Sequence, residues 1–317
     1  MALDPGRLLI TAARVVPRLP AWLTGGIFAA VAEAAALTRT GGTTQLTANL
    51  ARAVPQATPR QLRRLTRRGM RSYMRYYHDA LRLPAATDVH LGQRVRTVND
   101  AWVRAELTAG RPVVAALGHL GNWDLAGAWA TRFLAPVVTV AEHLEPEELF
   151  QGFLDFRRGL GMTIIPLEKD GSTFRELLRH TRTGSGNLVP LLADRDLSRN
   201  GVEVQLLGER ARVAPGPAAL ALATGSRLVS VGIHYERLRG ARRVAAGSRW
   251  GIVVTFGDPI EAPADVAREQ QVAWMTQRWV DELGVAIGEH PEDWHMLQPV
   301  FVADLDPARL NPAGSVA

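Results

Sequence analysis

The 317-residue chain contains no cysteine. A protein without cysteine has no disulfide, no thiolate nucleophile and no cysteine-ligated metal site. The absence agrees with a cytoplasmic location, where disulfides rarely form. Aromatic residues make up only 6% of the chain, and no nucleic-acid recognition motif is found. Nucleic acid is therefore not an expected partner.

Several common signatures are also missing. The chain has no Gly-x-Gly-x-x-Gly, no phosphate-binding P-loop and no Gly-x-Ser-x-Gly, which leaves nucleotide-driven and serine-hydrolase chemistry without support. Lysine occurs once, as Lys169, so nearly all basic residues are arginine, and the formal net charge is +6. Because arginine binds phosphate in a bidentate manner, this balance predicts anionic partners such as anionic lipid or a phosphate-bearing cofactor.

Long apolar runs are scarce. The longest, residues 21–37, contains a Gly-Gly pair and Glu33, and we judge it too short for a transmembrane helix. Its basic upstream residues and the alanines 34–36 also suit a signal peptide. The chemistry described below favours the cytoplasm, so we expect an interfacial or core helix here.

Apolar residues nevertheless make up 47% of the chain, enough for a sizeable core. Beyond residue 86, apolar strands alternate with helical patterns, which predicts an α/β fold with a largely parallel central sheet flanked by helices. Residues 1–85 are expected to form an N-terminal helical, membrane-associating segment, 86–305 the α/β core and 306–317 a tail, all within one structural domain. Expected strands cover 113–117, 137–140, 163–166, 187–193, 202–206, 228–234 and 252–257, and residues 89–98 are expected to be a polar connection.

The clearest helix is expected over residues 58–83. Thr58 can cap it, and Pro59 suits its first position. Four arginines repeat along one face at spacings of three and four, and that face contains no acid. They are Arg60, Arg64, Arg67 and Arg71. A solvated face is one interpretation. Because like charges at this spacing repel, we favour a membrane surface or phosphate-bearing ligand as their partner.

The strongest candidate for chemistry follows the apolar run 113–117. His119 lies just after this predicted strand, and Asp124 begins the next helix. Ligands of open α/β sheets bind at the carboxyl ends of strands. A carboxylate that orients an imidazole makes the histidine a usable general base, although a surface histidine beside a helix-capping aspartate is the alternative.

Other charged clusters are weaker candidates. Asp194-Arg195-Asp196 follow a second apolar strand, so they are expected at the same sheet edge as His119, although a turn is the alternative. Arg157-Arg158 end a helix. Residues 208–216 suit either an anion-binding or an ordinary surface loop. His290, His295 and the Glu142-His143 pair match no metal motif, so no metal site is expected.

Five blocks of the sequence resemble the lysophospholipid acyltransferase superfamily, in the form of the lipid A late acyltransferases and the actinobacterial phosphatidylinositol mannoside acyltransferases. They are Gly-His-Leu-Gly-Asn-Trp-Asp at 118–124, and residues 69–77, 156–162, 192–204 and 291–299. Their order and spacing across about residues 40–300 are more specific than any one block. Glycerol-phosphate acyltransferases of the same superfamily carry a Glu-Gly-Thr-Arg block for the acceptor phosphate. At the comparable point this chain has Ala-Asp194-Arg195-Asp196, which argues against a glycerol-phosphate acceptor.

The resemblance implies an O-acyltransferase that moves a fatty acyl group from acyl-CoA, a co-substrate, to a mannose hydroxyl of a phosphatidylinositol mannoside. It also implies a peripheral enzyme on the cytoplasmic face of the plasma membrane, with no other cofactor. His119 would be the general base and Asp124 its orienting partner. Substrate binding is expected of Arg157, Arg158, Asp194, Arg195, Asn122 and Trp123. Alternatives are another glycolipid or lysophospholipid acyltransferase, an acyl-CoA thioesterase, or a non-enzymatic peripheral lipid-binding protein.

Overall fold

A mixed α/β structure is seen in the computed structural model, which describes residues 12, 15–38, 41–143, 145–168, 171–183, 186–196 and 201–306. Its central sheet has the order β1 (Val95–Val98), β9 (Trp250–Phe256), β8 (Arg227–Arg237), β2 (Val113–Leu117) and β5 (Leu188–Leu192). Every neighbouring pair is parallel except β8 and β9. The predicted α/β fold with a largely parallel sheet is confirmed.

The other strands form two smaller sheets. β3 (Val138–Ala141) and β4 (Thr163–Pro166) pair in parallel, and Val137 bridges to Leu188 of β5, so this pair extends the central sheet. β6 (Val202–Leu206) and β7 (Glu209–Val213) form an antiparallel hairpin.

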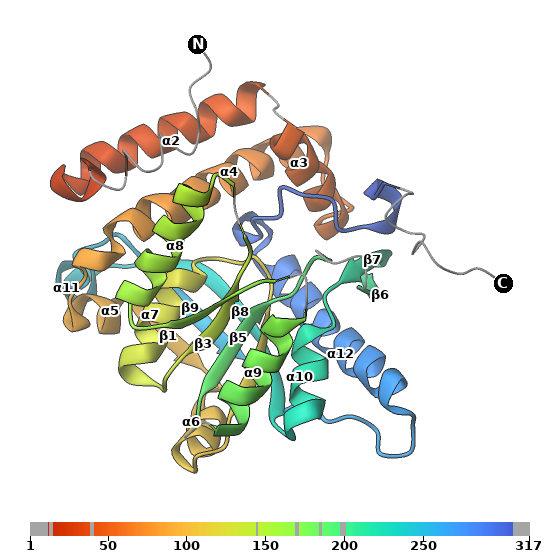
Figure 1. Cartoon of the computed structure of the whole chain (residues 1–317). Helices are drawn as coiled ribbons and strands as arrows, with labels where there is room; N and C mark the ends of the chain where they lie inside the picture. The colour runs from red at the N-terminus through yellow and green to blue at the C-terminus, as the bar shows by residue number, and fades with distance from the viewer. Residues whose placement is uncertain are drawn as a thin grey trace.

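Helices cover both faces of the central sheet, which is why β2 is buried along its whole length (Figure 1). Val113, Ala115 and Leu117 of β2 pack with one apolar cluster that includes α7 and α8. Val114 and Ala116 face a second cluster that includes α10 and α12. The helices of the core are α5 (Asp88–Arg94), α6 (Ala101–Thr108), α7 (Trp123–Phe133), α8 (Glu147–Gly159), α9 (Ser172–Thr183), α10 (Gly216–Thr224), α11 (Gly240–Ala245) and α12 (Arg268–Glu289).

Three N-terminal helices lie across the edge of this core: α2 (Ala21–Thr38), α3 (Gly41–Ala53) and α4 (Pro59–Arg82). The Thr58 hydroxyl accepts from the Gln61 N–H at 3.3 Å, while the Gln61 side chain accepts from the Thr58 N–H at 2.8 Å, so a capping box starts α4. The helix expected over residues 7–16 falls almost wholly outside the described residues.

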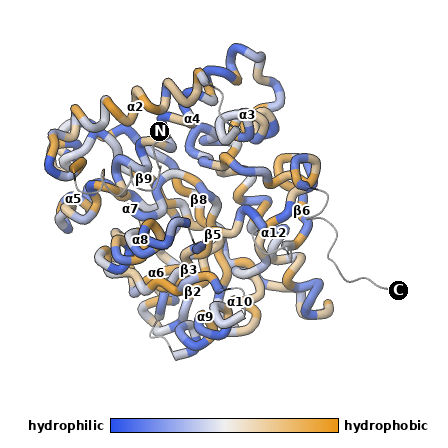
Figure 2. Tube along the Cα trace, turned by 45° about the horizontal axis from the view of Figure 1, so that its top comes forward, coloured by the Kyte–Doolittle hydropathy of each residue, from blue (hydrophilic) through white to orange (hydrophobic). Residues whose placement is uncertain are grey.

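The structure corrects three expectations. Residues 89–98 are not a polar connection, because α5 and strand β1 occupy them. The expected loop 208–216 contains strand β7. Helix α2 is, by length and composition, apolar enough to cross a membrane, and only 11% of it is buried in the protein. Figure 2 shows the apolar residues along α2 on the outside of the molecule.

Candidate active site

Two neighbouring strands bring the reactive residues together. β2 and β5 run in parallel, with Leu117 opposite Leu192. His119 and Asp194 each follow two residues after these partners, so both lie at the same carboxyl-terminal edge of the sheet. The expectation that the two charged strand exits converge is confirmed by a direct contact between the two side chains.

The contact joins a partly exposed histidine to a fully buried aspartate. His119 Nδ1 donates to Asp194 Oδ1 at 2.5 Å, and the His119 backbone N–H donates to Asp194 Oδ2 at 2.8 Å. Trp294 Nε1 also donates to Oδ2, at 3.1 Å. Burial alone would raise the pKa of Asp194, but the imidazole and these donors outweigh it and hold that pKa below its ordinary value. Asp194 therefore stays ionised and keeps the proton of the neutral imidazole on Nδ1, which leaves Nε2 as the basic nitrogen.

Asp124, the expected partner of His119, contacts other residues. Its Oδ1 accepts from Arg157 Nε at 2.7 Å, and its Oδ2 accepts from the Tyr76 hydroxyl at 2.6 Å. Burial alone would lower the pKa of Arg157, but the Asp124 carboxylate outweighs it and raises that pKa. The prediction that Asp124 orients His119 is wrong in this geometry, because the first turn of α7 directs its carboxylate toward α8 and α4.

Asn122, expected to bind substrate, instead caps helix α7. Its side chain is fully buried, its Oδ1 accepts from the Leu125 N–H at 2.9 Å, and its Nδ2 donates to the Tyr235 hydroxyl at 3.2 Å. Both hydrogen bonds of the Asn122 side chain are made within the protein, so its role in this structure is to stabilise the start of α7. Trp123 is different, because it stacks on Tyr76 with ring centroids 4.2 Å apart and lines two cavities.

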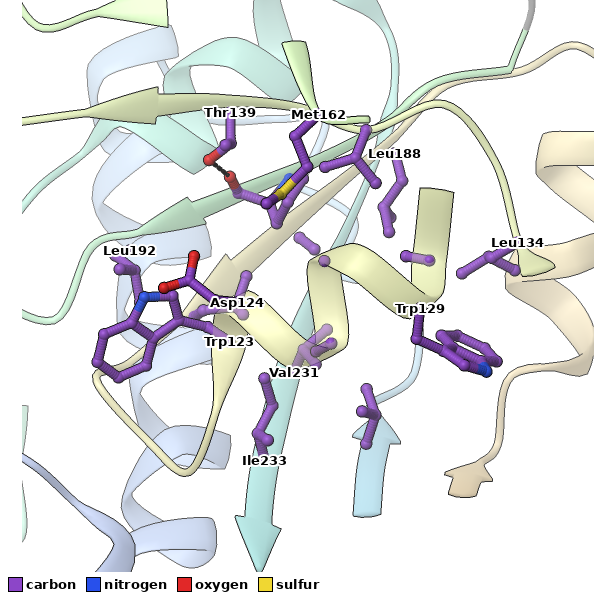
Figure 3. Close-up of a pocket in the computed structure, with 18 of the residues that line it drawn as sticks. Trp123, Asp124, Trp129, Leu134, Thr139, Met162, Leu188, Leu192, Val231 and Ile233 are labelled. Carbon is purple, nitrogen blue, oxygen red and sulfur yellow. Dashed lines mark hydrogen bonds between the residues drawn. The ribbon is translucent and has the colours of Figure 1, made fainter. Parts of the chain in front are cut away.

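The first cavity is narrow and apolar. It encloses about 730 Å³, counted to its open mouth, between α7 and strands of the central sheet. Figure 3 shows Trp123 and Asp124 at one end, and Leu134 and Trp129 at the other. The cavity follows α7, whose 11 residues correspond to a length of about 16 Å.

The second cavity is larger and more polar, about 2100 Å³ counted to its open mouth. His119, Arg195, Glu142 and His295 are among the residues that line it. Trp123 and Arg157 line both cavities. The His119 ring centroid lies 5.4 Å from the Trp123 ring centroid, so His119 is beside the junction of an apolar cavity with a polar one.

The remaining predicted residues are divided between this site and the surface. Arg195 pairs with Glu142 in the polar cavity. Arg158 is exposed and lines neither of these cavities.

An acidic residue of a neighbouring helix pairs with part of the arginine face of α4. Arg67 and Arg71 both pair with Glu33 of α2, so their favoured external partner is replaced by an acid of the chain itself. Arg60 and Arg64 remain exposed. The arginines of 208–216 are likewise near acids, since Arg210 pairs with Glu203 on the neighbouring strand; the anion-binding interpretation of that loop lacks support.

A second buried network was not predicted from the sequence. His295 Nε2 lies 3.0 Å from the Ser72 hydroxyl, which also bonds to Asp293. Burial, together with electrostatic repulsion from the neighbouring Arg75 and His119 side chains, lowers the pKa of His295 to about 3, so its imidazole is neutral at pH 7. His290 lies elsewhere, stacked on His234 with centroids 3.6 Å apart. The signal that could have revealed this network was Ser72, a small polar residue among the buried residues of α4.

The chain as a whole is similar to known acyltransferases. Residues 7–302 match the family described as bacterial lipid A biosynthesis acyltransferase. A phosphatidylinositol mannoside acyltransferase of Mycolicibacterium smegmatis is 37% identical over 95% of this chain and 93% of its own. One from Mycobacterium tuberculosis strain H37Rv is 37% identical over 86% of this chain and 81% of its own. The 1-acyl-sn-glycerophosphate acyltransferase of Thermotoga maritima, at 14% identity, covers 85% of this chain and 96% of its own with a TM-score of 0.37, too weak a likeness for an argument. The chain belongs to the bacterial lipid A biosynthesis acyltransferase family.

Proposed function

We propose that this protein transfers a fatty acyl group from acyl-CoA to a mannose hydroxyl of a phosphatidylinositol mannoside, at the cytoplasmic surface of the membrane. The observation that carries the proposal is the His119–Asp194 pair beside the junction of an apolar and a polar cavity. The names of the mycobacterial relatives support the acceptor.

The chemistry follows from the tautomer that Asp194 imposes. His119 Nε2 takes the proton of the acceptor hydroxyl as that oxygen attacks the thioester carbonyl carbon. The carbon–sulfur bond then breaks, an ester forms, and the CoA sulfur leaves with the proton that His119 received. Asp194 stabilises the imidazolium between these two proton transfers without becoming protonated itself.

The apolar cavity suits the acyl chain. Small side chains on α7 and β2 make room along its length, among them Ala126, Gly127, Ala130 and Ala115. An acyl chain placed there gains the free energy of apolar burial and brings its carbonyl to the Trp123 end, near His119. Arg157 is held at this end by Asp124, where its charge can stabilise developing negative charge or a phosphate of CoA.

The polar cavity suits a sugar headgroup. Glu142 accepts hydrogen bonds and Arg195 donates them, which matches the hydroxyl and phosphate groups of a mannosylated inositol lipid. Its open volume leaves room for an acceptor beside the thioester, as a transferase requires.

Helix α2 supports a peripheral membrane location. Its exposed apolar side chains include Trp22, Ile27, Val31 and Leu37, whereas Glu33 is held by two arginines of α4. A helix fixed to the protein along one face and apolar on the other suits the headgroup boundary of a bilayer. The acceptor lipid would then reach the site without leaving the membrane.

The test offers purified protein a mixed acyl-CoA pool and a lipid extract, with products identified by mass spectrometry. We expect an acylated mannoside, and no such product with folded His119→Ala. Near-normal transfer by this variant would disprove the mechanism. CoA release that is indifferent to added glycolipid would indicate a thioesterase. Vesicle binding without any transfer or CoA release would indicate a non-enzymatic lipid-binding protein.

A further inference from the structure

We propose that the last residue of β8 and the chain that connects it to β9, residues 237–249, form a second contact with an anionic bilayer. We call these residues the β8–β9 tip. The inference rests on the proposed function for its membrane location, but it concerns a surface remote from α2 in the sequence. It places one exposed valine and three exposed arginines, Arg239, Arg243 and Arg249, against lipid headgroups.

The tip projects from the edge of the sheet that carries the active site. β8 pairs in parallel with β2 up to Val231, opposite Leu117, and then continues to Arg237. At about 3.3 Å per residue, these six further residues carry the tip about 20 Å beyond the end of β2. His119 lies just past the same end of β2, so the tip and the base are on the same side of the sheet.

The tip has an unbalanced positive charge. It contains Arg237, Arg239, Arg242, Arg243 and Arg249 but no acid. Arg242 pairs with Glu236 just outside it. Arg239, Arg243 and Arg249 are exposed, and no carboxylate of the described residues lies within ion-pair distance of them. These three differ from Arg67 and Arg71, whose charges Glu33 compensates, so an external anion is the missing partner.

An apolar side chain accompanies the charges. Val244 on α11 is 81% exposed, more than the other large apolar residues that the structure describes as exposed. Leu238 and Ala246 on either side of it are buried and anchor the tip, and α11 packs against α5. A rigid support, arginines for phosphate groups and one apolar side chain for the acyl boundary together fit a lipid surface.

The position of α2 favours a bilayer over a protein partner. Arg82, at the end of α4, donates to the carbonyl oxygens of Val16 and Leu19, which tie the beginning of α2 to the end of α4. α5 follows α4 after the short 3-10 turn Leu83–Ala85, and it supports α11. In Figure 1 the tip, marked by α11, is at the end of the molecule where α2 begins. One flat anionic surface could therefore contact the apolar face of α2 and the tip together.

The first test measures vesicle binding by flotation. The variant Arg239→Gln/Arg243→Gln/Arg249→Gln is compared with Arg175→Gln/Arg179→Gln/Arg278→Gln, which removes the same charge from exposed residues of α9 and α12. On vesicles of phosphatidylcholine and phosphatidylinositol in equal parts, we expect about 100-fold weaker binding for the tip variant, about fivefold per arginine, and near wild-type binding for the control. Equal binding by the two variants would overturn the proposal.

The second test places a probe at the tip. Because the chain has no cysteine, Val244→Cys creates a unique thiol for an environment-sensitive fluorophore, and Val285→Cys gives a matched exposed valine on α12. We expect a blue shift with the anionic vesicles for the label at 244 only. No shift at 244, or a shift that depends on protein concentration without vesicles and so indicates a second copy, would overturn the proposal.

These experiments distinguish a failure of the tip contact from a failure of the proposed reaction. Acyl transfer by the wild type is assayed on the same vesicles. Wild-type transfer together with tip variants that bind normally would overturn the tip contact alone. Vesicle binding that depends on the tip, without transfer of any acyl group, would overturn the proposed reaction alone.

Discussion

Replacing Asp194 by asparagine should separate the roles of the two aspartates near His119. The asparagine amide would donate to Nδ1 where the carboxylate now accepts from it, so the imidazole proton would move to Nε2 and that nitrogen could no longer take a proton. The variant would also lose the charge that stabilises the imidazolium. At about 4 Å and an effective dielectric constant of about 20, that charge contributes about 4 kcal/mol, which is about 10³-fold in rate.

The assay is single-turnover transfer of a labelled acyl group, with acyl-CoA binding measured separately. We expect Asp194→Asn to lower the transfer rate by at least about 10³-fold while acyl-CoA binding changes little, because Asp194 does not line the apolar cavity. A thermal unfolding curve close to that of the wild type would show that the fold is intact.

Asp124→Asn is the matched control, because it makes the same chemical change five residues from His119. The substitution removes the carboxylate that pairs with Arg157, whose side chain is only 16% exposed. Removing one charge of such a largely buried pair costs about 3 kcal/mol of unfolding free energy. Adding Arg157→Gln should recover part of that stability. The reasoning is refuted if Asp194→Asn transfers at the wild-type rate, or if Asp124→Asn leaves stability unchanged and stops only the chemical step.

Further predictions concern the cavity, α2 and pH. Ala130→Phe should fill the far part of the apolar cavity and lower kcat/KM for long-chain acyl-CoA by about tenfold or more relative to a short chain, measured by competition; an unchanged preference would place the acyl chain elsewhere. Glu33→Gln should free Arg67 and Arg71, so affinity for anionic vesicles should rise several-fold while stability changes by less than about 1 kcal/mol; equal or weaker binding would count against these arginines as lipid contacts. Because the pKa of His295 is lowered to about 3 in the folded state, only the unfolded state binds this proton between about pH 6.5 and 3. Stability should therefore fall as pH falls, by about 2 kcal/mol from this residue between pH 6.5 and 5. His295→Gln should show a shallower dependence in urea unfolding, and an equal slope would contradict the buried neutral imidazole.

The parts of the fold with strong local signals could be predicted from the sequence. Residues 113–117 are β2 as expected, because a short apolar run between Arg-Pro and glycine is typical of a fully buried strand. α4 begins at Pro59 because Thr58 and Gln61 form the expected kind of cap. In both elements, the residues that determine the structure lie within a few positions of one another in the sequence.

The elements that were missed depend on distant partners. β1 has one buried residue, Val95, and its sequence Val-Arg-Thr-Val forms a strand because β9 offers an edge to pair with. β7 contains two arginines and is a strand because it pairs with β6, where Glu203 lies opposite Arg212 and forms an ion pair with Arg210. α5 is capped by Thr87 with His90 in the third helical position, where glutamate or glutamine would be the usual signal.

The candidate site shows the same division. His119 could be identified because a strand exit is a local feature, and the second exit at Asp194 could be placed on the same edge because parallel strands end together. Spacing along the chain suggested Asp124 as the partner of His119, yet five residues are enough to leave the strand, cap a helix with Asn122 and turn the carboxylate away. The register of β2 against β5 decides the contact instead, and no local pattern reveals a register between strands separated by more than 70 residues. The consequence is a division of labour between the two acids: Asp194 controls which imidazole nitrogen carries the proton, whereas Asp124 holds Arg157 at the junction of the two cavities.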